Sequence, residues 1–254
     1  MTDDPALREA MGHAERIGKS PDFARFREKL RSRFPQQVQV AEEALERDYV
    51  RVVDHHLRSL TPRLRAYLDS NVRRVLDFGC GSGGSAIALA MAYPGVFCHG
   101  TDVDAEEIEI AKERAQLYGV AERCDFRYVA PDSPLPFDDG FFDLCQCSSV
   151  LEYVVDPAAR QFCVREMVRL LAPDGLLFVS VPSRLYPFEI HSWWRGSPKW
   201  GWNYFPRLLK AHTVGCTVWE VQRLARPASL KLYRTPVKQL FKPWSTFCLR
   251  RESP

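Results

Sequence analysis

Short apolar runs alternate with longer segments of helix-forming residues from residue 72 onward. The runs lie at 75–78, 96–102, 126–129, 142–147 and 176–181, and they are rich in Val, Leu, Phe and Cys. Runs of this length and composition are typical of buried strands, and the segments between them are long enough for crossover helices. The alternation therefore predicts a parallel sheet with helices packed against it.

Residues 1–70 follow a helical period instead. Ser20-Pro21-Asp22 and Thr61-Pro62 each place a hydroxyl residue before a proline, which is typical of a helix start. We expect a helical N-terminal prefix over residues 1–70, laid over a sheet edge or a ligand site, and a second domain over residues 71–254. The spacing of apolar residues between the two helix starts predicts the buried stripe of one helix, made of Leu45, Tyr49, Val52, Val53, His56, Leu57 and Leu60.

Four glycines within six positions follow the first predicted strand, namely Gly79, Gly81, Gly83 and Gly84. Helix formers continue from Ala86, so the stretch predicts a strand, a tight turn and the first turn of a helix. Glycine lets a ligand approach bare backbone, and a helix start offers free N–H groups and a partial positive charge. A nucleotide-type cofactor is the expected ligand.

Two classes of cofactor site use this geometry. Gly79-x-Gly81-x-x-Gly84, with Asp102 about 20 residues later, fits the dinucleotide-binding fingerprint. Asp77 favours the other class, because it completes the pattern Asp-x-Gly-x-Gly-x-Gly. That pattern resembles motif I of class I S-adenosylmethionine (SAM)-dependent methyltransferases, in which the acid helps to hold the turn and the methionine end of the cofactor.

Three further segments resemble the small-molecule methyltransferases of this class, in the family's order. Residues 135–143 are similar to the approach to the fourth strand, residues 150–154 to the segment after it, and residues 166–175 to the run into the fifth strand. The resemblance covers residues 72–183, and it implies both the fold and the cofactor.

The implied fold is α/β: a Rossmann-like, doubly wound sheet of seven strands, of which the last is antiparallel. We expect the sixth strand at 215–221 and the seventh at 245–250. Asp104 followed by Glu107 predicts a capping box, and Asp156 before a proline predicts another helix start.

The resemblance also assigns a cofactor site for SAM. Asp102 is expected to accept hydrogen bonds from both ribose hydroxyls, and Val103 to pack on the adenine. As an alternative, Asp102 is a helix-capping acid, although Asp104 already fills that position. The residues expected around the methionine part of the cofactor are Asp77, Gly79, Gly81 and Gly83.

Four further residues are expected to contact the cofactor. Asp132 and Ser133 are placed near the adenine amino group, and Ser148 beneath the cofactor at the end of the fourth strand. Tyr49, in the helical prefix, is a candidate contact for the cofactor carboxylate and is equally explained as a core aromatic residue.

Methyl transfer from a sulfonium needs a base only when the acceptor must lose a proton. We expect His191 to be that base, because it lies about ten residues past the fifth strand and a histidine pKa near 6.5 leaves it largely unprotonated at neutral pH. Glu152, just after the fourth strand, is the alternative base, and an ordinary surface or core histidine is the alternative for His191. The aromatic insertion at about 184–206 is a candidate substrate cover, a lipid-contacting surface or plain core.

Composition narrows the class of protein. The 254 residues are 46% apolar and 26% charged, which suits one soluble α/β domain with an appendage. The acidic start has no apolar h-region and no run approaches about 18 apolar residues, so we expect neither a signal peptide nor a membrane span, and a cytoplasmic protein. Neither the eight scattered cysteines nor the adjacent pair His55 and His56 has the spacing of a metal site, so no metal is expected.

Charge is distributed unevenly along the chain. From Lys199 to the C-terminus, eleven Lys and Arg residues face two Glu residues, although the whole chain carries only +3. A basic segment of this kind suggests an anionic partner, or a solvated surface without one.

The resemblance implies SAM-dependent methyl transfer to a small molecule. We expect the transfer to be at oxygen, on a sugar or secondary metabolite that is anionic or lipid-linked. An RNA methyltransferase is one alternative. Against it, the sequence has no separate nucleic-acid module, and Cys147-Ser148-Ser149-Val150 stands where base N-methyltransferases carry Asn/Asp-Pro-Pro-Tyr/Phe. A non-catalytic SAM-binding partner subunit is the other alternative, and the oligomeric state is left open.

Overall fold

The computed structural model describes residues 4–33, 46, 50–68, 71–186, 213–234 and 244–252. The chain divides between residues 129 and 130 into two compact units. The predicted boundary near residue 70 separates the helical prefix from the second predicted domain. That boundary is different from the one between the two compact units, and it stays a prediction.

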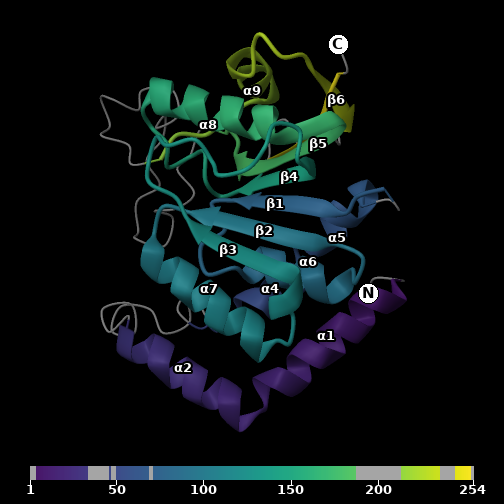
Figure 1. Ribbon diagram of the computed structural model, residues 1–254, viewed down its shortest axis with the longest axis vertical. Helices are drawn as coiled ribbons and strands as arrows, with labels where there is room; N and C mark the ends of the chain where they lie inside the picture. The colour runs from purple at the N-terminus through teal and green to yellow at the C-terminus, as the bar shows by residue number, and fades with distance from the viewer. Residues whose placement is uncertain are drawn as a thin grey trace. The chain divides into compact units, whose positions relative to one another are not determined.

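The first unit contains three parallel strands (Figure 1), which are β1 (Arg74–Phe78), β2 (Phe97–Asp102) and β3 (Cys124–Tyr128). Their register sets Asp77 opposite Gly100, and Asp102 opposite Tyr128. Crossover segments join the strands and contain α6 (Gly84–Ala92), α7 (Ala105–Leu117) and the short 3-10 helix η3 (Ala121–Arg123). Both Val75 and Leu76 of β1 are buried, as the continuous apolar run predicts for a strand covered on two faces.

The helical prefix belongs to the same unit and is confirmed over the described residues. It consists of α1 (Pro5–Gly18), α2 (Pro21–Arg33), α4 (Val52–Arg58), α5 (Thr61–Leu64) and the 3-10 turn η2 (Arg65–Tyr67). Ser20 caps α2 as predicted, since its hydroxyl accepts a hydrogen bond from Phe23 N at 3.1 Å.

The prefix packs on the helices that cross over between the strands. Both α1 and α4 contact α6, and Lys29 of α2 pairs with Glu113 of α7 at 2.7 Å. In Figure 1, α1 and α2 meet at an angle, and α2 runs beside α7. The predicted stripe is buried at Val53, Leu57 and Leu60, but the helix that carries it ends at Arg58.

The second unit contains β4 (Phe142–Ser148), α8 (Pro157–Leu170), β5 (Leu171–Pro182), α9 (Val218–Leu224), β6 (Leu230–Arg234) and β7 (Trp244–Arg251). Strand β4 is parallel to β5, whereas β7 runs antiparallel to both β5 and β6. The seven strands have the order β3-β2-β1-β4-β5-β7-β6 in one sheet. This order, with its antiparallel last strand, confirms the predicted Rossmann-like fold class.

The predicted sixth strand at 215–221 is wrong. Thr217 caps a helix there, because its hydroxyl accepts a hydrogen bond from Glu220 N at 3.2 Å, and α9 follows. Cys216 alone keeps an extended contact, a single bridge to Ser183. The sixth strand is β6, and the short run of β-branched and aromatic residues was outweighed by a local cap.

Strand β5 begins earlier than predicted, at Leu171, where it pairs with Phe142. The predicted turn at 173–175 survives as an irregularity inside the strand, with Asp174 at a φ of 62°. Among the residues that the structure describes, no helix is both long and apolar enough to cross a membrane.

Candidate functional site

The glycine turn between β1 and α6 has the backbone that the sequence predicts. Gly79, Gly81 and Gly83 have φ values of 70°, 49° and 78°, which side-chain-bearing residues rarely adopt. The amides of Gly79 and Cys80 both donate to the carbonyl of Thr101, at 2.8 and 3.0 Å. The end of β1 is thereby fixed to the end of β2, and the turn rises from that point.

The two faces of the turn differ in the space around them. A Cβ on Gly83 would lie 2.9 Å from both Ala111 and Phe126, and a Cβ on Gly84 would lie 2.6 Å from Val52. A Cβ on Gly81, by contrast, would meet nothing closer than a Glu107 oxygen at 3.9 Å. One face is therefore packed against α4, α7 and β3, while the backbone at Gly81 is bare, as a close-approaching ligand requires.

Asp102, at the end of β2, holds this turn directly. Its Oδ2 accepts a hydrogen bond from Gly81 N at 2.7 Å, and its Oδ1 accepts one from Asp104 N at 3.0 Å. The side chain of Val103, next to it, is 57% exposed. A carboxylate and an uncovered apolar side chain thus stand side by side at the edge of the turn, a pairing that suits a ribose and a base. These two ligand contacts stay predictions.

A cluster behind the turn was missed by sequence reasoning. Arg114 of α7 is fully buried and donates from Nη1 to the carbonyl and the hydroxyl oxygen of Ser82, each at 2.7 Å. Glu107 also forms a hydrogen bond with Ser82, and burial raises the pKa of Glu107 to about 7. The available signal was spacing: Glu107, Ala111 and Arg114 share one helix face, so two charges occupy the side that packs inward.

The predicted capping box at α7 is half wrong. Asp104 caps the helix as expected, because its Oδ1 accepts hydrogen bonds from Glu106 N and Glu107 N at 2.9 and 3.3 Å. The reciprocal bond from the Glu107 side chain to Asp104 N is replaced by Asp102, and Glu107 turns toward Ser82 instead.

The end of β4, in the second unit, carries the predicted Ser148. Its buried Oγ has no hydrogen-bond partner among the described residues. Ser149 follows with a φ of 59°, and its amide donates to Ser180 O at 2.9 Å. A strained backbone beside a buried hydroxyl without a partner is typical of a ligand site, and the cofactor contact of Ser148 stays a prediction.

Glu152 lies in the turn that follows and is completely buried. Burial raises the pKa of its carboxyl group to about 7, and the positive charge of Arg160 acts in the opposite direction. Its backbone carbonyl accepts a hydrogen bond from Val214 N at 2.7 Å. The predicted alternative base is thus held in place by the chain that returns after residue 212.

Arg160 organises the surroundings of Glu152. Its guanidinium donates to the carbonyls of Leu151 and Val214 at 2.9 and 3.0 Å, and it pairs with Glu220 of α9 at 3.3 Å. Glu220 also binds Arg184, just after β5, through two hydrogen bonds of 2.9 and 3.0 Å. These bonds join the segment after β4, the end of β5 and the start of α9.

The remaining predicted residues fall into two groups. Asp77 is buried in β1, and Asp132 and Ser133 lie in an exposed turn in which Asp132 has a φ of 57°. Tyr49 and His191 lie outside the described residues, as does the aromatic insertion from residue 187 onward. The insertion begins with Arg184, whose pairing with Glu220 gives that residue a structural role.

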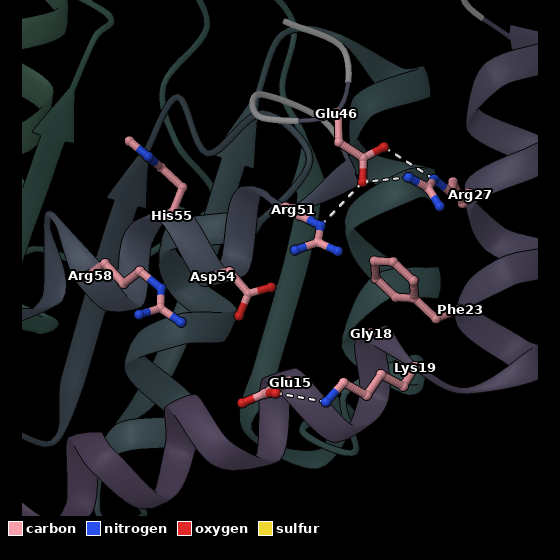
Figure 2. Close-up of a pocket in the computed structure, with 10 residues that line it drawn as sticks. All are labelled: Glu15, Gly18, Lys19, Phe23, Arg27, Glu46, Arg51, Asp54, His55 and Arg58. Atoms are coloured by element: carbon pink, nitrogen blue, oxygen red, sulfur yellow. Dashed lines mark hydrogen bonds and ion pairs between the residues drawn. The ribbon is translucent and has the colours of Figure 1, made fainter. Parts of the chain in front are cut away.

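A cavity of about 880 Å³ lies among α1, α2 and α4 (Figure 2). Charged side chains dominate its lining, and several form ion pairs: Lys19 with Glu15 at 2.7 Å, and Glu46 with both Arg27 and Arg51 at 2.8 and 3.2 Å. Asp54 points into its centre, and burial raises the pKa of Asp54.

This cavity is not the cofactor site. Its lining includes Arg51, the residue just before α4, and Asp54, His55 and Arg58 of α4, which lie along one side of the helix. The residues of α4 that approach the glycine turn are Val52 and His56, whose side chains lie nearest to a Cβ built on Gly84. The cavity and the turn therefore lie against different sides of α4.

The adjacent histidines His55 and His56 lie on α4. Their rings meet edge-on with centroids 5.5 Å apart, and burial lowers the pKa of His56 to about 4, with a smaller contribution from His55. Nowhere in the described ranges do three His, Cys, Asp or Glu side chains come together as metal ligands would.

Known proteins are similar to parts of this chain. Residues 75–175 match the family described as "Methyltransferase domain". Norajmaline N-methyltransferase from Rauvolfia serpentina is 36% identical over 42% of the chain, and a ubiquinone biosynthesis O-methyltransferase from Neisseria meningitidis serogroup A is 33% identical over 49%. A solved SAM-dependent methyltransferase from Methanosarcina mazei, 22% identical, has the same fold with a TM-score of 0.56, over 75% of this chain and 97% of that one.

The matched regions cover 35% and 52% of the lengths of the two curated relatives. Residues 75–175, which match the family model, contain the glycine turn, Asp77, Asp102 and Glu152. The resemblance to class I SAM-dependent methyltransferases is confirmed, and with it SAM as the cofactor of this class of domain.

Proposed function

We propose that this chain, which carries a class I SAM-dependent methyltransferase domain, transfers the methyl group of SAM to a hydroxyl oxygen of a small molecule. The cofactor part of the proposal is supported by the bare backbone at Gly81 and by Asp102 beside it. Glu152 supports an oxygen atom as the methyl acceptor, and the proposal depends mainly on this residue.

SAM, when bound, supplies a sulfonium-activated methyl group that leaves by an in-line displacement. The chain has two tasks: to align the acceptor with the methyl group, and to remove a proton where the acceptor must lose one. A hydroxyl acceptor does lose a proton, so a base is needed during the transfer.

Glu152 has the properties of that base. Burial raises its pKa to about 7, so near neutral pH the carboxylate is both available and basic enough to accept a hydroxyl proton. Arg160 fixes the turn that carries Glu152 by donating to Leu151 O, one residue before it. His191, predicted as the first choice of base, lies outside the described residues, and it remains the alternative.

The acceptor class rests on coarser grounds. The names of the relatives describe methylation of small molecules at nitrogen and at oxygen, which supports a small-molecule acceptor for this chain. An anionic group on the acceptor is proposed from the basic C-terminal third, and a lipid-linked group from the aromatic insertion at about 184–206. A sugar or secondary metabolite is proposed because the sequence after the fifth strand looks similar to that of methyltransferases that modify glycans and secondary metabolites. The cytoplasmic location expected from the sequence likewise stays a prediction.

A substrate panel with matched variants tests the base. Purified protein is incubated with methyl-labelled SAM and a panel of phenols, sugars and amines, and label transfer is measured for the wild type, Glu152→Gln and His191→Ala. We expect Glu152→Gln to lower kcat by roughly 10²–10⁴-fold with SAM affinity unchanged.

Asp156→Asn is the control, because it removes a charge four residues away while asparagine keeps the cap on α8. A Glu152→Gln protein that retains most of its activity would rule out Glu152 as the base. If His191→Ala alone abolished turnover, the base would be His191.

The two other functions make different predictions. An RNA methyltransferase would copurify with RNA and bind it less tightly as salt rises. A non-catalytic partner subunit would bind SAM and transfer no label to any acceptor until its catalytic partner was added.

A further inference from the structure

Glu107 lies on the first turn of α7, beside the glycine turn. Its Oε2 is the atom nearest to the position of a Cβ on Gly81, at 3.9 Å. Ser82, the next residue of the turn, is bonded to Glu107 and accepts two hydrogen bonds from Arg114. Glu107, Ser82 and Arg114 therefore form a cluster next to the backbone that is expected to contact the cofactor.

The charges around Glu107 are mostly negative. Asp104 caps the same helix, and Asp102 stands at the end of β2; both raise the pKa of Glu107 after the larger effect of burial. Arg114 is the cation that lowers it, and Arg114 has no contact with solvent. His56, beside the start of α6, is neutral near pH 7 because burial lowers its pKa to about 4.

Two neighbouring groups complete this surrounding. The pKa of the Cys80 thiol is raised well above its usual value by burial, so the thiol is uncharged at neutral pH. Arg33, on α2, pairs with Glu106 at 3.6 Å rather than with Glu107. Among the described groups that surround the glycine turn and are named above, Glu107 is thus the one whose pKa lies near 7.

We propose that Glu107 is a cofactor-selectivity residue, whose carboxylate favours the cationic cofactor SAM over its neutral product S-adenosylhomocysteine (SAH). SAM and SAH have the same ammonium and carboxylate groups and differ in the sulfonium charge. A carboxylate behind the bound cofactor attracts the first more than the second, and the low dielectric of a buried cluster strengthens the difference. The proposal depends on SAM as cofactor and is independent of the acceptor.

The buried charge of Arg114 increases the expected effect of Glu107 on SAM binding. With Glu107 ionised, the buried pair has no net charge, and its negative member lies nearer to Gly81. Without the carboxylate, a buried cation remains behind the turn and repels a cationic ligand. Selectivity of this kind would help product leave and fresh cofactor enter after each turnover.

Calorimetric titration of SAM and of SAH at pH 8 and low salt tests the proposal on the full chain. We expect Glu107→Gln, which keeps a hydrogen-bond acceptor for Ser82, to weaken SAM binding by about 5–20-fold and SAH binding by less than about twofold. Glu106→Gln is the matched control, because it removes the same charge one residue away from an exposed side chain, and it should leave the ratio of the two affinities unchanged.

Measuring the two affinities at several pH values separates the effect of the Glu107 charge from a structural effect of the substitution. In the wild type the preference for SAM over SAH should increase from pH 6 to pH 8, as Glu107 loses its proton, and in Glu107→Gln this increase should be absent. Because the ammonium group of SAM titrates in both proteins, the difference between them isolates Glu107.

Should Glu107→Gln fail to fold around its uncompensated cation, the double variant Glu107→Gln/Arg114→Met removes both charges, and its preference for SAM should still fall below that of the wild type. An equal loss of SAM and SAH affinity in the foldable variant would overturn the proposal, since a merely structural role weakens both. A wild-type protein that binds neither ligand would overturn the cofactor assignment along with it. Failure to find a methyl acceptor would leave the affinity ratio, and hence the proposal, unaffected.

Discussion

The carboxylate of Asp102 accepts a 2.7 Å hydrogen bond from the backbone amide of Gly81, a residue 21 positions earlier in the chain. One side chain at the end of β2 thus shapes the turn that follows β1. Its second oxygen holds Asp104 N and so fixes the entry into α7. A ligand that hydrogen-bonds to Asp102 would therefore bind to a group that is already oriented on both sides.

Asp102→Ala should weaken SAM binding by about 10–100-fold, which corresponds to roughly 1.5–3 kcal/mol for the loss of a charge-assisted hydrogen bond and of the turn's support. Titration calorimetry with SAM and NAD measures the effect. Asp156→Ala is the control: it removes an aspartate that accepts a backbone hydrogen bond at the start of another helix, α8, and it should lower the free energy of unfolding by about 1 kcal/mol without changing SAM affinity. Tight NAD binding by the wild type, with none of SAM, would contradict the cofactor assignment.

Gly81→Ala should mainly lower the affinity for SAM, whereas Gly83→Ala should mainly lower the free energy of unfolding. The added methyl at Gly83 would lie 2.9 Å from Ala111 and Phe126, so this variant should lose about 2–4 kcal/mol of unfolding free energy. The methyl at Gly81 has room within the protein but fills the bare face, so that variant should lose about 1 kcal/mol and most of its SAM affinity. Thermal unfolding and calorimetry on both variants check this, and a stable Gly83→Ala protein would show that the turn can shift.

Glu152→Gln should make the protein more stable at pH 8 while lowering its activity. Because the pKa of Glu152 is raised from 4.5 to about 7, the folded protein retains a proton that the unfolded chain has released. The free energy of unfolding therefore falls as pH rises from about 4.5 to 7, by up to about 3 kcal/mol, and stays low above that range. Urea titrations at pH 5 and pH 8 measure the free energy of unfolding, which should be higher in the variant than in the wild type at pH 8 only. If the difference in unfolding free energy between variant and wild type were the same at pH 5 and pH 8, the folded protein would stabilise Glu152 in its charged form.

Arg160→Met should lower the free energy of unfolding by about 3 kcal/mol, because the carbonyls of Leu151 and Val214 lose their buried donor. It should also raise the pKa of Glu152 further, since the cation that opposes the effect of burial is gone. The acid limb of the pH–activity profile would then move to higher pH. Arg165→Met, on the exposed side of the same helix, is the control and should change neither quantity; an unmoved pH profile in Arg160→Met would show that Arg160 does not act on Glu152.

Features governed by neighbouring residues were predictable from the sequence. The turn after β1 follows from Asp77 and the glycines, since a left-handed backbone at three positions needs residues without a Cβ. The helix starts at Ser20 and Asp156 follow from a side-chain oxygen that meets an amide three residues later. The parallel strands within each unit follow from apolar runs that must be buried on both faces.

The segment 215–221 shows where such prediction ends. Its apolar and β-branched residues suit a strand, and its hydroxyl residue Thr217 suits a helix cap. Strand pairing depends on a partner elsewhere in the chain, whereas a cap depends on the next three residues. Only the folded chain shows that β7 pairs with β6 and β5, which leaves this segment free to become α9.

The proton affinities of the site were decided by tertiary structure alone. The sequence marks Glu107 only by its place on α7 and Glu152 only by its place after the fourth strand, and it does not show that burial raises the pKa of both to about 7. The sequence by itself determined the glycine turn, the strands and the helix caps, because these depend on local backbone preferences and on the pattern of apolar residues. The fold decided which carboxyl groups are removed from water and which cations face them, because both depend on residues far apart in the chain.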